Sequence, residues 1–346
     1  LHLISGYLLG GQVIEVAKQM GLPVVLTLTE YYFMCPRLNL MHANYELCVG
    51  PEDDAKCSRC LLEDMRRFYY LQEAAPAMAD AFWSVAQNAG FARRKGDEVS
   101  ARRDYLMERL QQADIVIAPS RFILEKYAEY GYVHPDSVFI QHGVNRPQQY
   151  HSKDHSHDAE PVRFGFIGQI KSHKGVDLLT RAAKELLDEG LPISVDIWGR
   201  THDSPGYYSR LKKQVAEYSS ISFCGSFEGP RVWDVLEAID VLVVPSRWYE
   251  NCPTVILEAF KMNIPVIATN IGGMAELVQH ETNGLTFALN SVSDLSAQMR
   301  RIVTEPGLLQ RLRQGVPYVK TAAEEVREIY AQYERLLAKK RLQIPL

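Results

Sequence analysis

Apolar and polar positions along the chain predict short strands alternating with helices. Runs such as "PVVLTLT" and "DVLVVPS" have the length and composition of buried strands, whereas "GVDLLTRAAKELLDEG" has the pattern of an amphipathic helix. Strands are expected at residues 1–5, 23–29, 114–120, 138–144, 162–168, 193–199, 221–225, 240–246 and 265–269. Helices are expected at residues 11–21, 121–131, 175–190, 207–218, 232–239, 254–263, 274–279 and 322–340. Continuous apolar strands between amphipathic helices indicate an α/β protein with parallel sheets covered on both faces.

The alternation stops at residues 146–160, where "RPQQYHSKDHSHDAE" has no apolar periodicity and is typical of a linker. We therefore predict a Rossmann-like domain over residues 1–145 and a second over residues 161–320, with residues 321–346 forming a helix that packs back on the first. The first domain looks incomplete, because a doubly wound half is built from βαβ units of about 30 residues or more. We expect further N-terminal elements, about 60–90 residues, to precede Leu1.

Composition and charge exclude several classes of protein. The chain has 346 residues, of which 47% are hydrophobic and 23% charged, as in a globular protein of two domains. A net charge of -4 argues against a general nucleic-acid binder. No apolar run reaches the ~20 residues that span a bilayer, and the opening "LHLISGYLLGG" lacks the charged start of a signal peptide. We expect a soluble, cytoplasmic protein.

The segment "WYENCPTVILEAF", residues 248–260, follows a predicted strand end and begins a predicted helix. Ligands of doubly wound sheets bind beyond the carboxyl ends of the strands, so Glu250 is expected in the binding crevice. Pro253 suits the first position of a helix, because its missing N–H has no acceptor there. The amides of Thr254 and Val255 then point out of the helix N-terminus, where they can hold a phosphate oxygen.

A second carboxylate, Glu258, lies about one turn further along this helix. So close to a phosphate it would be repelled unless it bound a neutral group, and a pair of vicinal hydroxyls, as on a ribose, fits that requirement. By the same argument Glu250 suits the hydroxyls of a second polyol. The segment therefore predicts a polyol, a diphosphate and a ribose in order, which is the layout of a nucleotide sugar. The alternative is that both acids only favour the helix dipole.

These residues resemble a known family. "ENCPTVILE" is similar to the E-x7-E signature of retaining group 1 glycosyltransferases, family 4, which have the GT-B fold of two facing Rossmann-like domains. The likeness continues, in the family's order, through "PVVLTLTEYYFMCPR", "ADIVIAPSRF", "QHGVN", "FIGQIKSHKGVDLL", "DVLVVPS", "IPVIATNIGGMAELV" and "NGLTF". The resemblance implies a retaining hexosyltransferase that moves a sugar from a UDP- or GDP-type donor to a sugar or lipid-linked acceptor hydroxyl, in polysaccharide or glycolipid biosynthesis. It also implies that catalysis needs no metal ion or other cofactor.

The resemblance assigns roles to individual residues. Lys174, in "SHKG", matches the lysine that neutralises the donor diphosphate, Glu258 the ribose ligand and Glu250 the residue that faces the transferred sugar. Glu250 and Lys174 are therefore the expected catalytic residues. The expected donor site comprises Gly168, Gln169, Lys174, Asn251, Cys252, Pro253, Thr254, Val255 and Glu258.

The chain departs from the family pattern at two places. Gln169 stands where an arginine usually helps to bind the diphosphate, and Thr29 and Glu30 stand where similar members carry a His-Asp pair. Thr29 and Glu30 remain candidate sugar or acceptor contacts, as do His142 and Gly143 in "QHGVN", although a structural histidine is an equal alternative. These departures keep open a non-catalytic nucleotide-sugar-binding subunit, and a nucleotide-sugar epimerase of the same fold is a further alternative.

Four cysteines lie close together in the polar, loop-like stretch of residues 35–60. Cys35, Cys48, Cys57 and Cys60 are spaced as C-x12-C-x8-C-x2-C. Four thiolates with a terminal C-x2-C are able to form a tetrahedral structural zinc site. Reduced thiols or one disulfide in a packed loop are the alternatives.

The first domain also contains a basic region, formed by Arg66, Arg67, Arg93, Arg94, Lys95, Arg102 and Arg103. Such a region is able to hold a phosphorylated or lipid-linked acceptor at a membrane surface, which here would be the inner face of the cytoplasmic membrane. The alternative is a solvated helix face.

Overall fold

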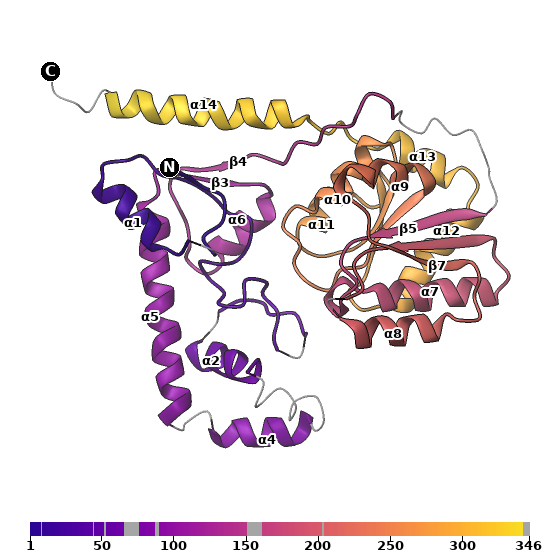
Figure 1. Ribbon diagram of the computed structural model, residues 1–346, viewed down its shortest axis with the longest axis horizontal. Helices are drawn as coiled ribbons and strands as arrows, with labels where there is room; N and C mark the ends of the chain where they lie inside the picture. Colours follow the sequence, from indigo (N-terminus) through magenta and orange to yellow (C-terminus); the bar gives the residue numbers. More distant parts are fainter. Residues whose placement is uncertain are drawn as a thin grey trace. The chain divides into compact units, whose positions relative to one another are not determined.

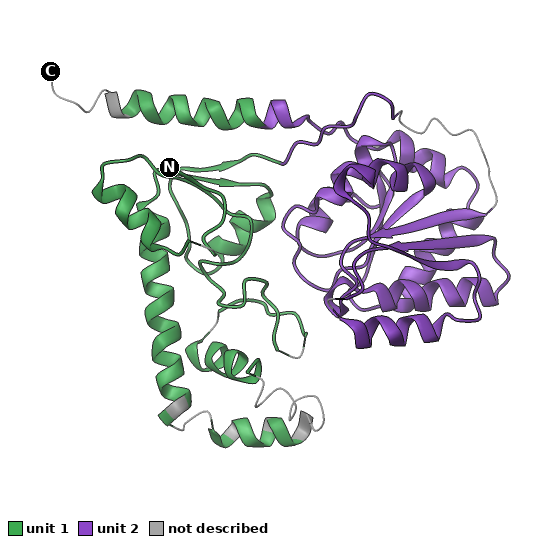
Figure 2. Ribbon diagram, viewed as in Figure 1, with its two compact units in different colours: residues 1–141, 326–346 green, residues 142–325 purple. Residues whose placement is uncertain are grey.

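The computed structural model describes residues 1–7, 9–43, 45–51, 53–65, 76–86, 90–150, 161–202 and 204–341. The chain forms two compact units, one of Leu1–Gln141 with Val326–Leu346 and the other of His142–Glu325 (Figure 2). Each unit is built around one parallel sheet with helices packed on it (Figure 1). The α/β fold class predicted from the alternating pattern is therefore confirmed.

The sheet of the first unit has the strand order β1-β2-β3-β4, and all its neighbouring strands are parallel. Its strands are β1 (His2–Leu3), β2 (Val25–Thr27), β3 (Ile115–Ala118) and β4 (Ser137–Phe139). In register, Val25 pairs with Ile115 and Val116 with Ser137. The strands are shorter than the apolar runs that predicted them; the run at residues 138–144, for example, contributes only Val138 and Phe139 to β4.

The helices of the first unit are α1 (Gln12–Gln19), α2 (Asp54–Glu63), α4 (Pro76–Ala86), α5 (Gly90–Gln112), α6 (Arg121–Ala128) and most of α14 (Ala322–Arg341). Three residues of α14, Ile329, Tyr333 and Leu336, pack on an apolar cluster of the sheet that includes Val25 and Ile115. This packing joins the C-terminal end of the described chain to the first sheet.

Three of these helices, α2, α4 and α5, were not predicted. The expectation that residues 35–60 are loop-like was wrong for their last part, since Cys57 and Cys60 lie on α2. The carboxylate of Asp53 caps α2 by accepting a hydrogen bond of 2.6 Å from the amide of Lys56. An aspartate followed by a second acid in the first turn is a helix-start signal, and it explains the helix despite its few apolar residues.

The sheet of the second unit has the order β10-β9-β8-β5-β6-β7 and is parallel throughout. Its strands are β5 (Val162–Ile167), β6 (Ile193–Trp198), β7 (Ile221–Gly225), β8 (Val241–Val244), β9 (Val266–Thr269) and β10 (Gly284–Phe287). The order of strands reverses between β5 and β8, which lie side by side. A doubly wound sheet binds its ligand at this switch point, beyond the carboxyl ends of the strands.

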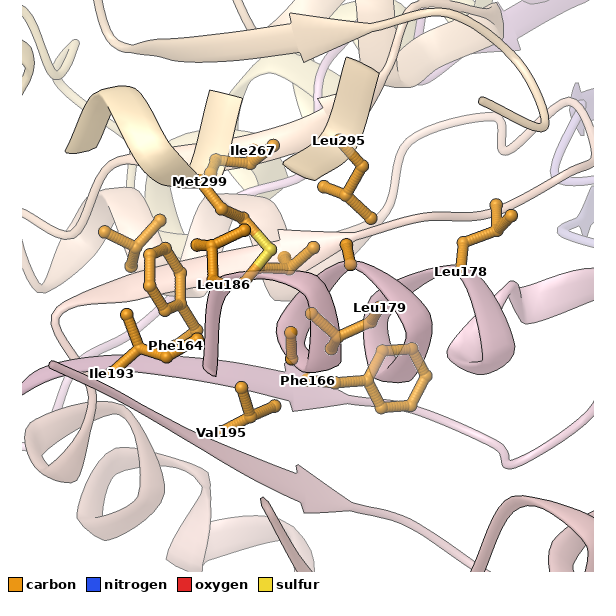
Figure 3. Packing of buried hydrophobic residues seen from close by; sticks show 14 of the residues in the cluster. Phe164, Phe166, Leu178, Leu179, Leu186, Ile193, Val195, Ile267, Leu295 and Met299 are labelled. Atoms are coloured by element: carbon orange, nitrogen blue, oxygen red, sulfur yellow. The ribbon is translucent and has the colours of Figure 1, made fainter. Parts of the chain in front are cut away.

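Helices cover both faces of this sheet. They are α7 (Val176–Asp188), α8 (Pro205–Gln214), α9 (Val232–Ala238), α10 (Thr254–Lys261), α11 (Gly272–Leu277), α12 (Val292–Thr304) and α13 (Leu308–Gln314), with short 3-10 turns at Ser172–Lys174 and Gly229–Arg231. On one face, Phe164, Leu179, Leu186 and Met299 belong to a cluster formed by strands, α7 and α12 (Figure 3). On the other face, α9, α10 and α11 pack on alternate strand residues such as Leu242.

Candidate functional site

A close backbone approach at the switch point brings the loop after β5 to the end of β8. Gly175 has φ +69°, and a Cβ atom there would lie 1.9 Å from the carbonyl oxygen of Pro245. Only glycine fits such a position, so this residue sets how near the two loops come. Lys174 immediately precedes Gly175 in this loop.

Glu250, in the loop after β8, is the centre of a polar cluster. Its Oε1 accepts hydrogen bonds from Lys174 Nζ at 2.6 Å, from Trp248 Nε1 at 2.7 Å and from Ser246 Oγ at 2.8 Å. The side chains of Lys174 and Glu250 are only 21% and 11% exposed, so water screens their ion pair weakly. Lys174 Nζ also lies 5.0 Å from the centroid of the Trp248 ring. The structure thus brings together the two residues that were expected to be catalytic.

A second ion pair ties these loops together. Arg247 donates to both carboxylate oxygens of Asp177 at 2.6 and 2.7 Å and to the carbonyl oxygen of Ser172 at 2.8 Å. Burial acts to raise the pKa of Asp177, but the hydrogen bonds from Arg247 and Tyr207 outweigh it and hold the pKa below its ordinary value. Sequence reasoning missed this pair, although Arg247 stands one residue beyond a predicted strand end.

His173, next to Lys174, is a neutral neighbour of the cluster. Its ring makes an edge contact with Trp248, with the centroids 6.0 Å apart. Burial and then the charge of Lys174 lower the pKa of His173 to about 4. At neutral pH His173 is therefore uncharged.

Helix α10 begins at Thr254, and Pro253 is its N-cap residue with φ -66° and ψ 107°. Pro253 was predicted at the first helical position, but it lies one residue before it, because the ψ angle of Pro253 is that of extended backbone. Thr254 and Val255 occupy the first turn, whose amides have no acceptor within the helix. Both amides are thus oriented as a phosphate-binding helix end requires.

The backbone before α10 is fixed by close packing on α11. The amide of Gly273 donates to the carbonyl oxygen of Glu250 at 2.7 Å, and a Cβ atom on Gly273 would lie 1.6 Å from the carbonyl oxygen of Asn251. Asn251 is buried. Burial raises the pKa of the Cys252 thiol to about 12, so this thiol is neutral. The two residues support the turn between Glu250 and the helix.

Glu258 has a different environment from Glu250. It lies in α10 and is half-buried, and within the described part of the chain no group donates a hydrogen bond to its carboxylate. Burial alone raises the pKa of Glu258 to about 7. Burying a carboxylate that receives no hydrogen bond costs free energy, and a ligand that donates hydrogen bonds from its hydroxyl groups would offset this cost.

Gly168 and Gln169 follow the end of β5 directly. The Gly168 amide donates to the carbonyl oxygen of Trp198 at 3.0 Å. The carbonyl oxygen of Gly168 would lie 1.8 Å from a Cβ atom on Gly199, so the two loops pack closely. Gln169 is half-buried and brings no charge to this position. The loop after β5 thus contributes Lys174 as the cation that pairs with Glu250.

In the first unit, Thr29 and Glu30 lie just beyond the carboxyl end of β2. The Glu30 carboxylate accepts a hydrogen bond from Ser5 at 2.8 Å and one from the Thr29 hydroxyl, which also lies 3.0 Å from the carbonyl oxygen of Ile4. The hydroxyl of Tyr127 donates to the Glu30 carbonyl at 3.0 Å. These bonds give both residues structural partners, and their contact with a sugar or acceptor stays a prediction.

His142 and Gly143 also have structural partners. The Glu325 carboxylate lies 3.0 Å from His142 Nδ1 and accepts from the Gly143 amide at 2.8 Å. A Cβ atom on Gly143 would lie 2.2 Å from the carbonyl oxygen of Thr321. The structure thus gives both residues a role in joining two chain segments, and a substrate contact for them stays a prediction.

The four clustered cysteines of the first unit line one small pocket, but they do not form a closed metal site. Among the residues that the structure describes, no three histidine, cysteine, aspartate or glutamate side chains are close enough to hold a metal ion. All four thiols are free of disulfides. Burial is the largest effect that raises the pKa of Cys57 and of Cys60 to about 12.

At least three of the seven residues in the predicted basic region have partners within the protein. Arg102 donates to the carbonyl oxygen of Tyr32 at 2.7 Å, Arg103 pairs with Asp54 at 2.5 Å, and Lys95 pairs with Glu98 at 2.8 Å. Arg93 and Arg94 are exposed. Arg66 and Arg67 lie outside the described residues.

The described helices include no candidate membrane span. None of them combines the length and the apolar content that a transmembrane helix needs.

The chain has two parallel α/β units. A helix N-terminus, a lysine and two carboxylates lie around the switch point of the second sheet, at the edge where doubly wound sheets hold their ligands. Comparison with known proteins identifies the family. Residues 147–339 match the family described as glycosyl transferases group 1, and the chain belongs to that family. The resemblance inferred from the E-x7-E segment is confirmed.

Individual relatives agree with this assignment. An uncharacterised glycosyltransferase of Methanocaldococcus jannaschii is 27% identical over 166 residues, which are 48% of this chain and 40% of the relative. A D-inositol 3-phosphate glycosyltransferase of Rhodococcus jostii is 30% identical over 158 residues, which are 44% of this chain and 35% of the relative. The matched part thus spans less than half the length of either relative.

A solved structure supports the fold over nearly the whole chain. The Anabaena protein HepE, in complex with UDP and glucose, has a TM-score of 0.59 at 15% identity and covers 96% of this chain and 98% of that one. At this identity the likeness concerns the fold alone. The GT-B fold expected from the resemblance is confirmed.

Proposed function

We propose that the protein is a retaining glycosyltransferase that moves a sugar from a nucleoside-diphosphate donor to an acceptor hydroxyl. The observation that carries the proposal is the position of Lys174, the α10 N-terminus and Glu258 around the switch point of the second sheet. In this proposal the diphosphate binds between Lys174 and the amides of Thr254 and Val255, and the ribose hydroxyls bind Glu258. The donor is of the UDP or GDP type, and Anabaena HepE, a protein of the same fold, binds UDP.

The chemistry follows from where charge develops. As the bond between the sugar and the diphosphate breaks, negative charge grows on the leaving oxygen, and a nearby ammonium stabilises the transition state more than the ground state. Lys174 and the helix amides supply that stabilisation in this proposal, so no metal ion is needed at the diphosphate. Glu250, held by three donors, is fixed to accept hydrogen bonds from the hydroxyls of the transferred sugar.

The acceptor and the pathway are inferred from the family resemblance. We propose a sugar or lipid-linked acceptor in polysaccharide or glycolipid biosynthesis, with the enzyme in the cytoplasm at the inner face of the membrane. The exposed Arg93 and Arg94 support a contact with an anionic surface, while the internal pairs of Arg102 and Arg103 do not.

The test begins with a thermal-shift screen of nucleoside diphosphates on the full-length protein, because a tight ligand stabilises the folded state by mass action. The matching sugar donors are then incubated with and without simple sugar acceptors, and nucleoside diphosphate and sugar products are quantified. We expect slow donor hydrolysis without acceptor and faster release of diphosphate with a suitable one. Formation of an epimer of the donor, or binding without any turnover, would contradict the proposal.

A non-catalytic nucleotide-sugar-binding subunit is the second candidate. It is favoured by Gln169, which brings no charge where the family usually has an arginine, and by the ion pair that already occupies Lys174. Under this candidate, donor binds with ordinary affinity but is neither hydrolysed nor transferred. Gln169→Arg would then add affinity without adding turnover, whereas an enzyme should gain both.

A further inference from the structure

The four cysteines of the first unit surround a pocket that has room for about one small ion. Cys35, Cys48, Cys57 and Cys60 all line this pocket, whose volume is about 20 Å³. A buried water needs at least about 10–15 Å³, so the space suits a single atom with its ligands around it. Four thiols at one such pocket are the ligand number and type of a tetrahedral zinc site.

Two local elements deliver the cysteines in pairs. Cys35 and Cys48 flank a short antiparallel bridge between Met41 and Leu47, and the Cys48 amide donates to the Leu40 carbonyl at 2.8 Å. Cys57 and Cys60 lie three residues apart on α2, so their side chains share one face of the helix. A turn that supplies two thiols and a helix that supplies two more can enclose an ion from opposite sides.

Two cationic side chains line the pocket. A divalent zinc with four thiolates carries a net charge of about -2. Arg37 and Lys56 line the same pocket and bring two positive charges. The side chain of Arg37 is only 14% exposed, and its Nε is buried without a hydrogen-bond acceptor. The guanidinium of Arg37 already pairs with the carboxylate of Asp64 at 2.5 Å, and a thiolate sulfur would give its Nε an acceptor.

The backbone between the first two cysteines adopts unfavourable conformations. Leu38, Leu40 and Tyr45 have φ values of 70°, 50° and 66°, in the left-handed region that residues with a Cβ atom seldom occupy. Such conformations persist only where the surrounding structure enforces them. A cross-link through Cys35 and Cys48 would supply such a constraint.

We propose that Cys35, Cys48, Cys57 and Cys60 bind one structural zinc ion. The sulfurs are not at ligand distance in this structure, and they reach it by turning about their Cα–Cβ bonds into the pocket. Each thiol loses its proton to solvent as its sulfur binds, so one Zn²⁺ and four thiols give a four-coordinate site and four released protons. The residues proposed to bind the donor, Lys174, Glu250 and Glu258, lie in the second unit, so zinc binding can be tested separately from donor binding.

The cysteine pocket is connected by hydrogen bonds to the segment that follows Thr29 and Glu30. The Cys35 amide donates to the carbonyl oxygen of Tyr31 at 2.7 Å, and the Tyr31 amide donates to that of Leu38 at 3.2 Å. Tyr31 directly follows Glu30 in the chain. Loss of the ion should therefore loosen the end of this segment while nucleotide binding in the second unit is kept.

The test is metal analysis of the full-length protein, purified under reducing conditions without a His-tag. We expect about one zinc per chain, released by a thiol-blocking mercurial, and we expect Co²⁺ to replace it with the intense absorption of tetrahedral thiolate coordination. Cys57→Ser and Cys60→Ser should each lower the zinc content to near zero. Cys224→Ser is the matched control and should leave it unchanged, because Cys224 lies in β7 of the second unit.

Some outcomes would overturn the proposal. A reduced wild-type chain that contains no zinc and takes up neither Zn²⁺ nor Co²⁺ at micromolar concentration has no such site. Equal loss of metal in Cys224→Ser, or a disulfide among the four cysteines in freshly isolated protein, would also contradict it. If Cys57→Ser fails to fold, mercurial release of zinc from the wild-type protein still decides the question.

Discussion

The two carboxylates at the start of α10 have opposite environments. One oxygen of Glu250 receives three hydrogen bonds, one of them from a lysine, whereas nothing in the described structure donates to the carboxylate of Glu258. Glu250 is therefore already positioned without a ligand. Glu258 carries a desolvation cost that raises its pKa to about 7, and a bound ligand with hydroxyl groups would offset this cost. The difference supports separate roles for the two acids: Glu250 orients the transferred sugar, and Glu258 binds the ribose hydroxyls.

The comparison also changes the expectation for Lys174. In the absence of ligand its charge is balanced by Glu250 at 2.6 Å, so an arriving diphosphate must share this cation with the carboxylate. Binding the diphosphate weakens the ion pair between Lys174 and Glu250, so the net gain in binding free energy from Lys174 is smaller than for an unpaired lysine. Removing Glu250 should therefore leave diphosphate affinity unchanged or slightly higher, while removing Lys174 should lower it.

The largest effect is expected for Lys174→Ala. Loss of one preorganised charge at the leaving group typically costs about 10²–10³ in turnover, and the nucleoside diphosphate should also bind more weakly. Turnover of the identified donor and calorimetry with the diphosphate measure the two effects. Lys213→Ala, on the exposed last turn of α8, is the control and should change neither. Normal turnover in Lys174→Ala would separate this lysine from the chemistry.

The next effect concerns the Arg247–Asp177 ion pair, which holds the loop after β8 to the start of α7. Asp177→Asn should lower the free energy of unfolding by about 1–3 kcal/mol, because it weakens a bidentate bond to the half-buried Arg247. The pKa of Asp177 is depressed in the folded state, so its stabilisation is present above the ordinary value of 3.8 and is lost as pH falls through the folded value. Urea unfolding at pH 7 and at pH 3 should show a smaller difference between wild type and variant in acid. An equal difference at both pH values would contradict this.

A smaller effect is expected from the titration of Glu258. Its pKa is raised from 4.5 to about 7, so the folded state binds this proton more tightly and the free energy of unfolding falls as pH rises through that window. An ionised carboxylate is the stronger acceptor for a diol, so affinity for the diphosphate should rise between about pH 6 and pH 8, by at most about tenfold per pH unit. Calorimetry across this range should show the rise in wild type, and Glu258→Gln should lack the part due to this group. Parallel pH profiles for the two proteins would show that Glu258 does not titrate in the site.

The proximity of Lys174 and Glu250 could be predicted from the sequence because both residues follow strand ends. Lys174 comes after β5 and Glu250 after β8, and parallel strands bring such positions to one edge of the sheet. The Arg247–Asp177 pair was not predicted, since it depends on the close approach that Gly175 permits. Helix α2 was missed because its start rests on a single capping carboxylate, Asp53, in a polar stretch. The contrast between the two acids was also invisible in the sequence, because it arises from burial and donors that only the folded chain brings together.

The most direct test of the account compares a nucleoside diphosphate with its 2′,3′-dideoxy analogue. If Glu258 binds the ribose diol, wild type should prefer the natural diphosphate by about 1.5–3 kcal/mol in calorimetry, as expected for hydrogen bonds to a charged group. Glu258→Ala should lose this preference, whereas Glu250→Ala should keep it while turnover of the full donor falls. If Glu258→Ala keeps the preference for the diol, or if Glu250→Ala loses it, the assignment of the two carboxylates is wrong.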